Sequence, residues 1–375
     1  FTLFTSGSTG IPKGIIHGTG GYLLYTKLTC MDKFGITKNS VVLTASDAGW
    51  INGHTYSLFG PLSLGATTIL LNKPTIILDY KFLKKILIKL KVTTLYLPVT
   101  LIRLMKSIFP NKKIKASSLK VLGSMGEPLA NIIGRWFSNF FFLNNKAIIN
   151  TYFQTETGGI ISSPNFKDYS KIVPHGSVGK PLYNQINLSK LNKTTKKEIR
   201  VKNPWPGCMI DVLNGLKVWK KYWAKNREFR LFDLATKETG NIYIHGRIDD
   251  VINIRGHRIG SGEIESVLLK IKAVRECCAV VIPDKLEGNV IYLFISSANT
   301  KIDDNINKII LEYFGTYALP KKIIYLNELP KTRSGKIMRR LLRDITVKKS
   351  KNKIGDTTTI LNPNVIDDIY NKLND

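Results

Sequence analysis

The stretch Thr5-Ser-Gly-Ser-Thr-Gly-Ile-Pro-Lys-Gly, close to the first residue, most constrains what this chain can fold into. Glycine allows backbone angles that other residues avoid, so successive N–H groups in such a stretch can converge on an anion. The spacing is not that of a Walker A loop, where Lys directly follows the second Gly and Ser or Thr follows the Lys. The stretch predicts a polyphosphate-binding loop, with a plain Ser/Gly turn as the alternative. The expected contacts are Thr5, Ser6, Gly7, Ser8, Thr9, Gly10 and Lys13.

Length and composition indicate a globular chain of two or three domains, since 375 residues with 43% hydrophobic residues can bury a sizeable core. No apolar run approaches the roughly 20 residues of a spanning helix, so we expect no membrane partner. The chain begins at Phe1, inside an apolar run, which predicts an N-terminally truncated sequence. The cysteines, Cys30, Cys208, Cys277 and Cys278, show no metal-ligand spacing, and they fit a reducing cytoplasm.

A formal charge of +29 raises nucleic acid as a partner. The lysines are spread along the whole chain beside abundant Ile and Asn, which favours a solvated lysine surface over a binding patch. We therefore expect no nucleic-acid partner, and salt-sensitive DNA binding would be the observation that reverses this expectation.

Hydrophobic patterning predicts alternating strands and helices in the first half of the chain. Strands are expected at 41–45, 66–71, 94–97 and from 119 and 148, and helices at 15–31, 57–63, 81–91 and 99–109. Such alternation predicts an α/β fold with a doubly wound sheet whose ligand loops follow the strand ends. The first helix should point its N-terminus at the bound phosphates. Short strands from 176 to 244 suggest a distorted β-barrel, and a smaller α+β domain should run to about Ile345.

Five later motifs fit the same chemistry: Gly126-Glu-Pro, Tyr152-Phe-Gln-Thr-Glu-Thr-Gly, Gly246-Arg-Ile-Asp-Asp, Gly256-His-Arg-Ile-Gly and Pro330-Lys-Thr-Arg-Ser-Gly-Lys. With the first loop, they resemble the motifs of the adenylate-forming enzymes, which include acyl-CoA synthetases, luciferases and peptide synthetase adenylation domains. The resemblance covers nearly all of the chain. It implies a large AMP-binding domain ending at residue 248, of which residues 1–248 form the rear part. It also implies a small mobile domain from 249 to 375, with Asp249 as the hinge.

The resemblance implies a reaction in which a carboxylate attacks the α-phosphate of ATP and a thiol then displaces AMP. Lys336 would be the catalytic residue, reaching the acyl carboxylate and α-phosphate, since a compact charge on a long stem can enter for one half-reaction and leave for the other. Glu156 would hold Mg²⁺ with ATP. Alternatively, Gln154-Thr-Glu-Thr is simply a helix N-cap. Besides the first loop, the nucleotide contacts implied are Gly126, Glu127, Pro128, Asn150, Thr151, Tyr152, Phe153, Gln154, Thr155, Asp233, Arg247 and Arg258.

Within this superfamily the chain most resembles the acetyl-CoA synthetases. Three stretches carry this narrower likeness: Ile16-His-Gly-Thr-Gly-Gly-Tyr-Leu, Asp47-Ala-Gly-Trp-Ile-Asn-Gly-His-Thr-Tyr and Gly355-Asp-Thr-Thr-Thr-Ile-Leu. The implied acyl pocket comprises Trp50, Ile51, Met125 and Phe153, and the implied CoA contacts are Asn52 and Arg255. Main-chain carbonyls of Leu269, Ile271 and Val274 would hold a structural cation. The chain departs from the family at several of these positions. Phe153 stands where acetate enzymes carry a Trp and leaves more room, while Met125, where a Val is usual, takes some of that room back. Leu311 replaces a CoA-contacting Arg, Asn52 a Thr and Arg255 a Ser, and Phe232 replaces the Gly before Asp233.

The function implied is that of an AMP-forming acetate–CoA ligase using ATP, acetate, CoA and Mg²⁺. Lys336 would also be the target of a lysine acetyltransferase and deacetylase, because acetylation removes its charge. Two other interpretations stay open beside the nucleic-acid one. In the first, the substrate is propionate or another short acid. The sequence does not separate this acid from acetate, because one methylene changes binding by only about 1–3 kcal/mol. Otherwise the chain is a decayed, inactive remnant, which Leu311, Phe232 and the truncation favour.

Overall fold

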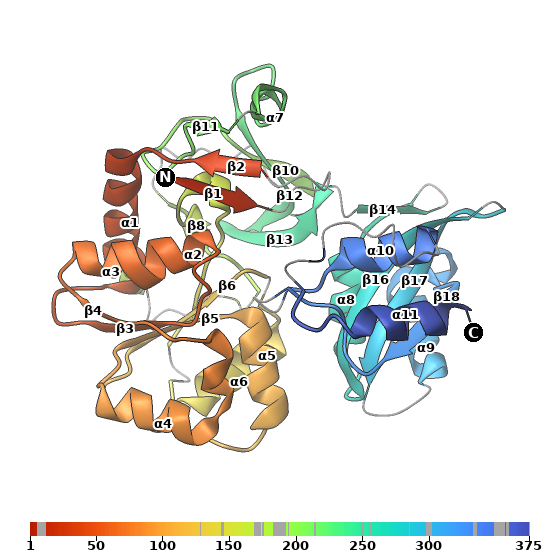
Figure 1. Ribbon diagram of the computed structural model, residues 1–375, viewed down its shortest axis with the longest axis horizontal. Helices are drawn as coiled ribbons and strands as arrows, with labels where there is room; N and C mark the ends of the chain where they lie inside the picture. The colour runs from red at the N-terminus through yellow and green to blue at the C-terminus, as the bar shows by residue number, and fades with distance from the viewer. Residues whose placement is uncertain are drawn as a thin grey trace. The chain divides into compact units, whose positions relative to one another are not determined.

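The computed structural model describes the chain except residues 6–12, 128, 144–145, 169–173, 175, 183–192, 194, 214, 249–250, 255–256, 285, 298–301, 333–335, 349–356, 358–359 and 375. Of residues 251–253, 257–258 and 374 it describes the backbone only. The chain divides into two compact units, Phe1–Ile244 and His245–Asp375 (Figure 1).

The first unit is built on a five-stranded parallel sheet in the order β4-β3-β5-β6-β7. Helices cover both of its faces, so the doubly wound α/β fold expected from the sequence is confirmed (Figure 1). The strands are β3 (Val41–Thr44), β4 (Thr67–Ile69), β5 (Thr94–Pro98), β6 (Val121–Met125) and β7 (Ile149–Asn150). The helices are α1 (Thr19–Phe34), α2 (Ile51–His54), α3 (Gly60–Ser63), α4 (Tyr80–Lys89), α5 (Val99–Ile108) and α6 (Asn131–Phe140).

Alternation along each strand divides the apolar side chains between two cores. On β5, Leu95 and Leu97 pack in the core shared with α4, α5 and α6, whereas Tyr96 packs on the opposite face with Phe34 of α1. On β6, Leu122 faces the first core, and Val121 and Met125 face the second. Continuous apolar strands are typical of a parallel sheet that is buried on both sides.

The helix expected at 15–31 is wrong at its start. Lys13–Ile16 forms β2, which pairs antiparallel with β1 (Thr2–Thr5), and α1 begins only at Thr19. Ile15 is fully buried in a core of short strands, and this tertiary packing overrides the helical spacing. The predicted phosphate loop therefore joins two strands of a hairpin, and its residues 6–12 lie outside the described part of the chain.

The helix expected at 57–63 begins earlier and changes its winding. It runs as α2, then a π-helical turn η1 (Thr55–Phe59), then α3. Single π-turns inside helices are common at functional sites. Here Tyr56, a residue of this turn, lies in the same core as Phe34 and Tyr96. Its hydroxyl accepts a hydrogen bond from Ile160 N–H at 2.7 Å.

The rest of the first unit forms small sheets of two or three strands, most of them short as the sequence predicts. These are β8 (Ser162–Ser163) with β9 (Lys180–Pro181), β11 (Asp211–Val212) joined to β2, and the sheet β10 (Lys197–Val201), β12 (Phe229–Glu238) and β13 (Asn241–Arg247). Short helical segments are η2 (Pro74–Leu78), η3 (Thr155–Thr157), η4 (Phe166–Asp168) and α7 (Leu216–Lys221).

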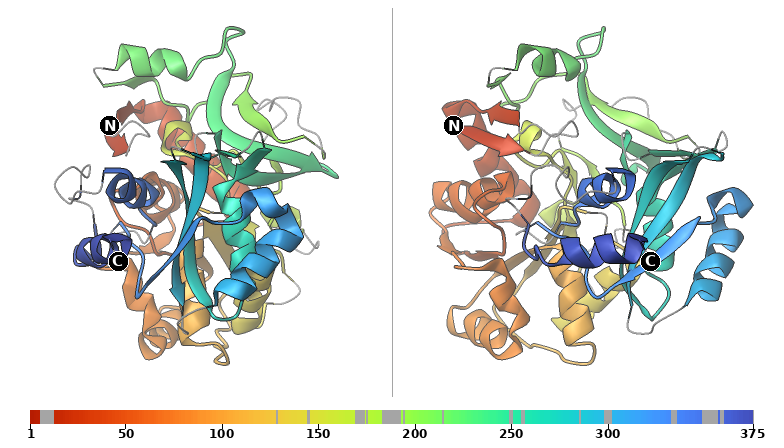
Figure 2. Two further views of the ribbon diagram at one scale, coloured as in Figure 1. Left: turned by 90° about the vertical axis from the view of Figure 1, so that its right-hand side faces the viewer. Right: turned by 45° about the vertical axis from the view of Figure 1, so that its right-hand side comes forward.

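The second unit is an α+β layer structure. A hairpin of β14 (Val251–Ile254) and β15 (His257–Gly260) precedes the sheet of β16 (Val274–Asp284), β17 (Gly288–Ser297) and β18 (Lys322–Leu326). Helices α8 (Ser261–Leu268) and α9 (Asp303–Phe314) lie on one face, followed by η6 (Thr316–Ala318). Helices α10 (Arg339–Lys348) and α11 (Val365–Asn374) lie on the other face (Figure 2). Neighbouring Cys277 and Cys278 face opposite cores for this reason.

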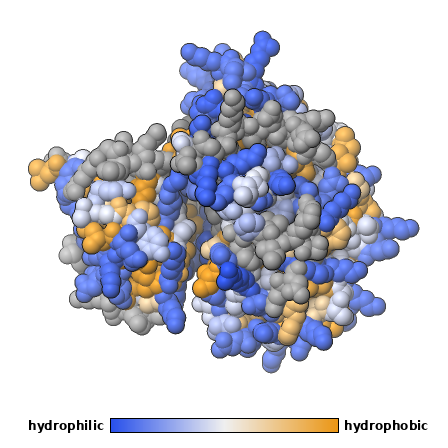
Figure 3. Space-filling model, turned by 180° about the vertical axis from the view of Figure 1, so that it is seen from behind, coloured by the Kyte–Doolittle hydropathy of each residue, from blue (hydrophilic) through white to orange (hydrophobic). Residues whose placement is uncertain are grey.

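This unit extends past Ile345, where hydrophobic patterning placed its end, because α11 buries Val365 and Ile369 against α10 and the sheet. The range to residue 375 that the resemblance implies includes this helix. The predicted boundary at Asp249 remains a prediction, since that residue is among those not described. None of the helices in the described part of the chain is long and apolar enough to cross a membrane. On the face shown in Figure 3, hydrophilic residues are spread over the described surface of both units.

Candidate nucleotide site

Two polar strand ends lie side by side at the carboxyl edge of the parallel sheet, where ligands bind in open α/β sheets. After β6, Gly126 has φ 87°, a left-handed conformation that favours glycine. The next residue, Glu127, pairs with Arg103 of α5 at 2.7 Å. After β7, the Thr151 hydroxyl contacts that of Tyr96 at 2.5 Å and donates to the carbonyl of Ser124 at 3.0 Å. These contacts fix the chain that leads into the Tyr152–Thr157 motif.

Asp233 is the point on which this motif converges. Its buried carboxylate accepts from the Tyr152 hydroxyl at 2.7 Å and from Gln154 Nε2 at 2.6 Å, both at Oδ2. The same Gln154 amide donates to the carbonyl of Leu231 at 2.7 Å. Residues about eighty positions apart in sequence thus form one polar cluster. A carboxylate held in this way can accept hydrogen bonds from a ligand's hydroxyl pair.

A β-bulge presents Asp233. Glu198 lies opposite Leu234, but Arg200 lies opposite Arg230, so residues 231–233 of β12 face Ile199 alone. Within the bulge Phe232 has φ 56°, in the left-handed region. The position at which the sequence departs from the family's Gly is therefore one where the backbone favours glycine.

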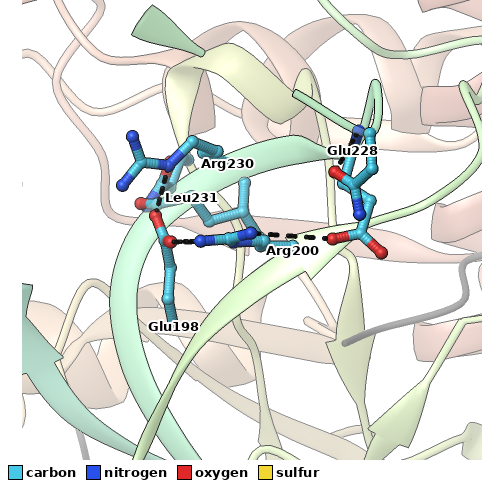
Figure 4. A network of polar contacts seen from close by, with 7 residues as sticks. Glu198, Arg200, Glu228, Arg230 and Leu231 are labelled. Atoms are coloured by element: carbon cyan, nitrogen blue, oxygen red, sulfur yellow. Dashed lines mark hydrogen bonds and ion pairs between the residues drawn. The ribbon is translucent and has the colours of Figure 1, made fainter. Parts of the chain in front are cut away.

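An ion-pair network holds the two strands on either side of this bulge (Figure 4). The Glu198 carboxylate contacts Arg230 Nε at 2.8 Å and Arg200 at 2.7 Å, and Arg200 reaches Glu228 at 3.9 Å. The Glu198 side chain is only 10% exposed. Two arginines that would otherwise repel across the strand pair are thus bridged by one carboxylate.

Glu156, the expected Mg²⁺ ligand, is oriented by a residue that sequence reasoning missed. The Tyr222 hydroxyl donates to Glu156 Oε1 at 2.6 Å, and the ammonium of Lys13 lies 5.6 Å from the centre of the Tyr222 ring. Tyr222 follows α7 and stacks on Phe229 at 5.7 Å. It belongs to no motif, so only the folded chain brings it to the site.

The motif itself closes into the 3₁₀ turn η3, capped by Gln154 N–H donating to the Thr157 hydroxyl at 2.9 Å. The structure therefore shows the cap geometry of the helix-cap alternative, and the site role of this segment stays a prediction. His17 fastens the turn through Nε2, 2.8 Å from the carbonyl of Thr155. Burial lowers the pKa of His17, which favours the neutral ring that donates this bond. Gly158 has φ 67°, and a Cβ there would lie 2.1 Å from the carbonyl oxygen of Gly207.

Of the expected acyl-pocket residues, Met125 and Phe153 pack in one apolar cluster with Tyr56, whose ring lies edge-on to Phe153 at 5.6 Å. Trp50 and Ile51 lie at the N-terminus of α2. Asn52, the expected CoA contact, is 5% exposed, and neither polar atom of its side chain has a hydrogen-bond partner among the described residues. An unpaired buried amide is costly, and a polar ligand group would satisfy it.

The remaining expected site residues belong to the second unit. Arg247 ends β13, and the backbone of Arg258 pairs with Asn253 in the β14–β15 hairpin. Asp249 and Arg255, like Pro128 and loop residues 6–10, are not described. For the expected cation site, Leu269 caps α8 and the Ile271 carbonyl accepts from Val274 N–H at 3.0 Å. Lys336 is exposed, and none of the described residues pairs with its ammonium group.

No group of three or more His, Cys, Asp or Glu side chains able to hold a metal ion occurs among the described residues. Glu156 offers a single carboxylate, already held by Tyr222 at one oxygen. This donor set suits Mg²⁺ that is held largely by substrate phosphates, because Mg²⁺ commonly uses one or two carboxylates beside them.

The fold and this polar cluster define a nucleotide-binding class of protein, and sequence comparison identifies it. Residues 1–223 match the AMP-binding enzyme family, and residues 263–336 match the AMP-binding enzyme C-terminal domain. The chain belongs to the AMP-binding, adenylate-forming enzyme family.

Known relatives are similar over almost the whole chain. It is 35% identical to acetyl-coenzyme A synthetase 2 of Kluyveromyces lactis over 98% of its length, which covers 58% of the relative. It is 36% identical to acetyl-coenzyme A synthetase 2 of Saccharomyces cerevisiae and to acetyl-coenzyme A synthetase of Phycomyces blakesleeanus, again over 58% of each relative. The chain therefore spans less than two thirds of the length of these relatives.

Solved structures share the fold. An anthranilate CoA ligase in complex with anthranoyl-AMP aligns with a TM-score of 0.75 at 23% identity, covering 90% of this chain and 65% of that one. A benzoate CoA ligase from Burkholderia xenovorans aligns with a TM-score of 0.76 at 24% identity, covering 92% and 68%.

Proposed function

We propose that the protein to which this chain belongs is an AMP-forming acetate–CoA ligase. The observation that carries the proposal is the cluster around Asp233, which joins the Tyr152–Gly158 motif to this expected nucleotide contact in a chain 35% identical to acetyl-coenzyme A synthetases. In the proposed reaction an acetate oxygen attacks the α-phosphorus of ATP, and the bond to the bridging oxygen breaks to release pyrophosphate. The CoA sulfur then attacks the acetyl carbon, and AMP leaves with its electron pair.

Each part of the site has a role in this proposal. Asp233 accepts the ribose hydroxyls, Arg247 contacts the ribose, and Thr155 bonds the α-phosphate. Glu156 holds Mg²⁺, which when bound with ATP neutralises phosphate charge. The first loop and Lys13 hold the outer phosphates, and Arg258 meets the phosphates from the second unit. Asn52 and Arg255 contact CoA.

Acid selection rests on Phe153 and Met125 in the apolar cluster. Phe153 leaves more room than the Trp of acetate enzymes, and Met125 takes some of that room back, so propionate is a second candidate substrate. The ratio of kcat/KM for acetate and propionate distinguishes the two, and a ratio below one assigns the enzyme to propionate.

Lys336→Ala tests the proposal. Its ammonium stabilises charge in adenylation only, so the variant should lose acetate-dependent pyrophosphate exchange by at least about 100-fold. Conversion of supplied acetyl-adenylate to acetyl-CoA should be largely retained, because a different arrangement serves the second half-reaction. Retained pyrophosphate exchange would refute the role of Lys336 and with it the proposed control by acetylation. Absence of acetate-dependent pyrophosphate exchange in the unaltered full-length protein would refute the activity.

A further inference from the structure

The C-terminal stretch Gly355-Asp-Thr-Thr-Thr-Ile-Leu contributes to the family likeness but has no role in the site described above. In the structure its last residues run beside the loop that carries Lys336. Thr332 forms a β-bridge with Ile360, and Leu361 N–H donates to the carbonyl of Lys331 at 2.8 Å. The chain end therefore adds a short strand-like segment to the base of this loop.

Asn362 fixes that segment with both halves of its amide. Its Oδ1 accepts from Lys331 N–H at 3.1 Å, and its Nδ2 donates to the carbonyl of Leu329 at 3.0 Å. The half-buried amide thus satisfies a main-chain donor and a main-chain acceptor that lie two residues apart, on the segment leading to Lys336.

The base of the loop is closed by main-chain contacts on its other side. Thr332 N–H donates to the carbonyl of Lys336 at 2.9 Å, and Lys336 N–H donates to the Thr332 hydroxyl at 3.2 Å. Met338 N–H donates to the carbonyl of Pro330 at 2.8 Å. Any displacement of Lys331 and Thr332 is therefore transmitted directly to the backbone of Lys336.

The segment is itself anchored. Directly after it, α11 buries Val365 and Ile369 against α10, and the Lys372 ammonium donates to the carbonyl of Tyr325 at 2.6 Å. The Lys331 side chain, 13% exposed, pairs with Glu276 of β16 at 2.7 Å. The segment that holds Asn362 and the side chain of Lys331 are thus both attached to the core elements of the second unit.

We infer that Asn362 is a positioning residue for Lys336, and that the chain end serves adenylation by bracing the loop. The inference rests on the role proposed for Lys336 above. An exposed lysine on a loop has many accessible positions, and holding its backbone reduces the entropy lost when the ammonium reaches the reacting atoms.

The test uses Asn362→Ala in the full-length protein, with Asn305→Ala as the matched control, since Asn305 is an exposed asparagine of α9 in the same unit. Hydrogen exchange of a peptide spanning residues 329–338 should speed about ten-fold in Asn362→Ala, because two hydrogen bonds are lost. Acetate-dependent pyrophosphate exchange should fall about ten-fold, while conversion of supplied acetyl-adenylate stays unchanged. The control should alter neither. Should the alanine variant fail to fold, Asn362→Asp keeps the acceptor for Lys331 and loses only the donor.

Faster hydrogen exchange with unchanged adenylation would overturn the positioning role, and slower adenylation without faster hydrogen exchange would overturn the brace. An equal fall in both half-reactions would indicate a merely structural residue. Failure of the role proposed for Lys336 would be seen in a different experiment, as retained pyrophosphate exchange in Lys336→Ala. The hydrogen-exchange result for Asn362→Ala could still be interpreted in that case.

Discussion

Phe232 occupies a backbone conformation that costs a residue with a Cβ about 1–2 kcal/mol relative to glycine. Its ring offsets part of this cost by lying 4.6 Å from the guanidinium of Arg230 and edge-on to Tyr222 at 5.5 Å. With Phe in place of the family's Gly, the backbone at the bulge is strained, and the ring gains contacts with Arg230 and Tyr222. Asp233 remains within hydrogen-bond distance of Tyr152 and Gln154.

Two variants of this residue separate the backbone from the ring. Phe232→Ala and Phe232→Gly both lose the ring, but only alanine retains the strain, so the glycine variant should be the more stable by about 1 kcal/mol. Urea unfolding measures the difference. The control is Ala235→Gly in the same strand. It should lower the free energy of unfolding, because the φ of Ala235 is not positive and glycine there only adds backbone freedom to the unfolded chain. An alanine variant more stable than the glycine variant at position 232 would contradict the strain.

Tyr222→Phe removes the hydroxyl from Glu156 and keeps the stacked ring. We expect the Mg²⁺ concentration for half-maximal pyrophosphate exchange to rise about ten-fold, since residues that orient a metal ligand typically change affinity by 10–100-fold. Mn²⁺ binding in the presence of ATP, followed by electron paramagnetic resonance, should weaken similarly. Tyr80→Phe, which loses a hydroxyl bond to the carbonyl of Lys113, is the control. Equal Mg²⁺ dependence in both variants would remove Tyr222 from the site.

At the scale of the element, the β10–β12 pair shows how a site carboxylate is supported from behind. The bulge interrupts the ladder between two regular segments, and Glu198 bridges Arg200 and Arg230 across that interruption. The network therefore spans the part of the strand pair from which Asp233 projects.

Glu198→Gln should lower the free energy of unfolding by about 1–3 kcal/mol, because it leaves two partly buried arginines without their shared anion. It should also weaken AMP binding, measured by calorimetry, through displacement of Asp233. Glu238→Gln is the control, since its pairing with Lys193 is largely exposed and contributes little. Unchanged AMP binding in Glu198→Gln would mean that the bulge holds Asp233 without the network.

At the scale of the whole molecule, the chain forms two units with separate cores, and the division falls at Ile244 and His245 within β13. The predicted hinge, Asp249, lies a few residues further on. Motif residues proposed for one reaction are found in both units, and the proposed mechanism includes a change in the arrangement of the units between half-reactions.

Asp249→Pro should slow adenylation and thioester formation unequally, because proline fixes φ near −65° and favours one arrangement. Asp249→Ala controls for loss of the carboxylate. Rates of pyrophosphate exchange and of acetyl-adenylate consumption provide the two measurements. Equal losses in the proline variant would place the hinge elsewhere.

The parallel sheet and its helices could be predicted because most of its strands belong to short, largely apolar runs bounded by turn residues, and the helices carry their own spacing. The error at 15–31 arose where that spacing was ambiguous. Ile15 and Ile16 suit a helix or a strand equally well, and pairing with β1 and β11 decided for the strand. Likewise, α11 follows a charged run and becomes part of the second unit only through burial of Val365 and Ile369.

The sequence by itself determined the motif residues and the fold class, because local patterns encode both. Only the tertiary structure decided how these residues are held. Tyr222 on Glu156, Glu198 behind the bulge and Asn362 beneath the Lys336 loop are single polar residues with no periodicity and no motif of their own. Their partners Glu156, Arg230 and Lys331 lie 31 to 66 positions away in sequence, and a hydrogen bond or ion pair over that separation exists only after folding brings its two atoms within about 3 Å.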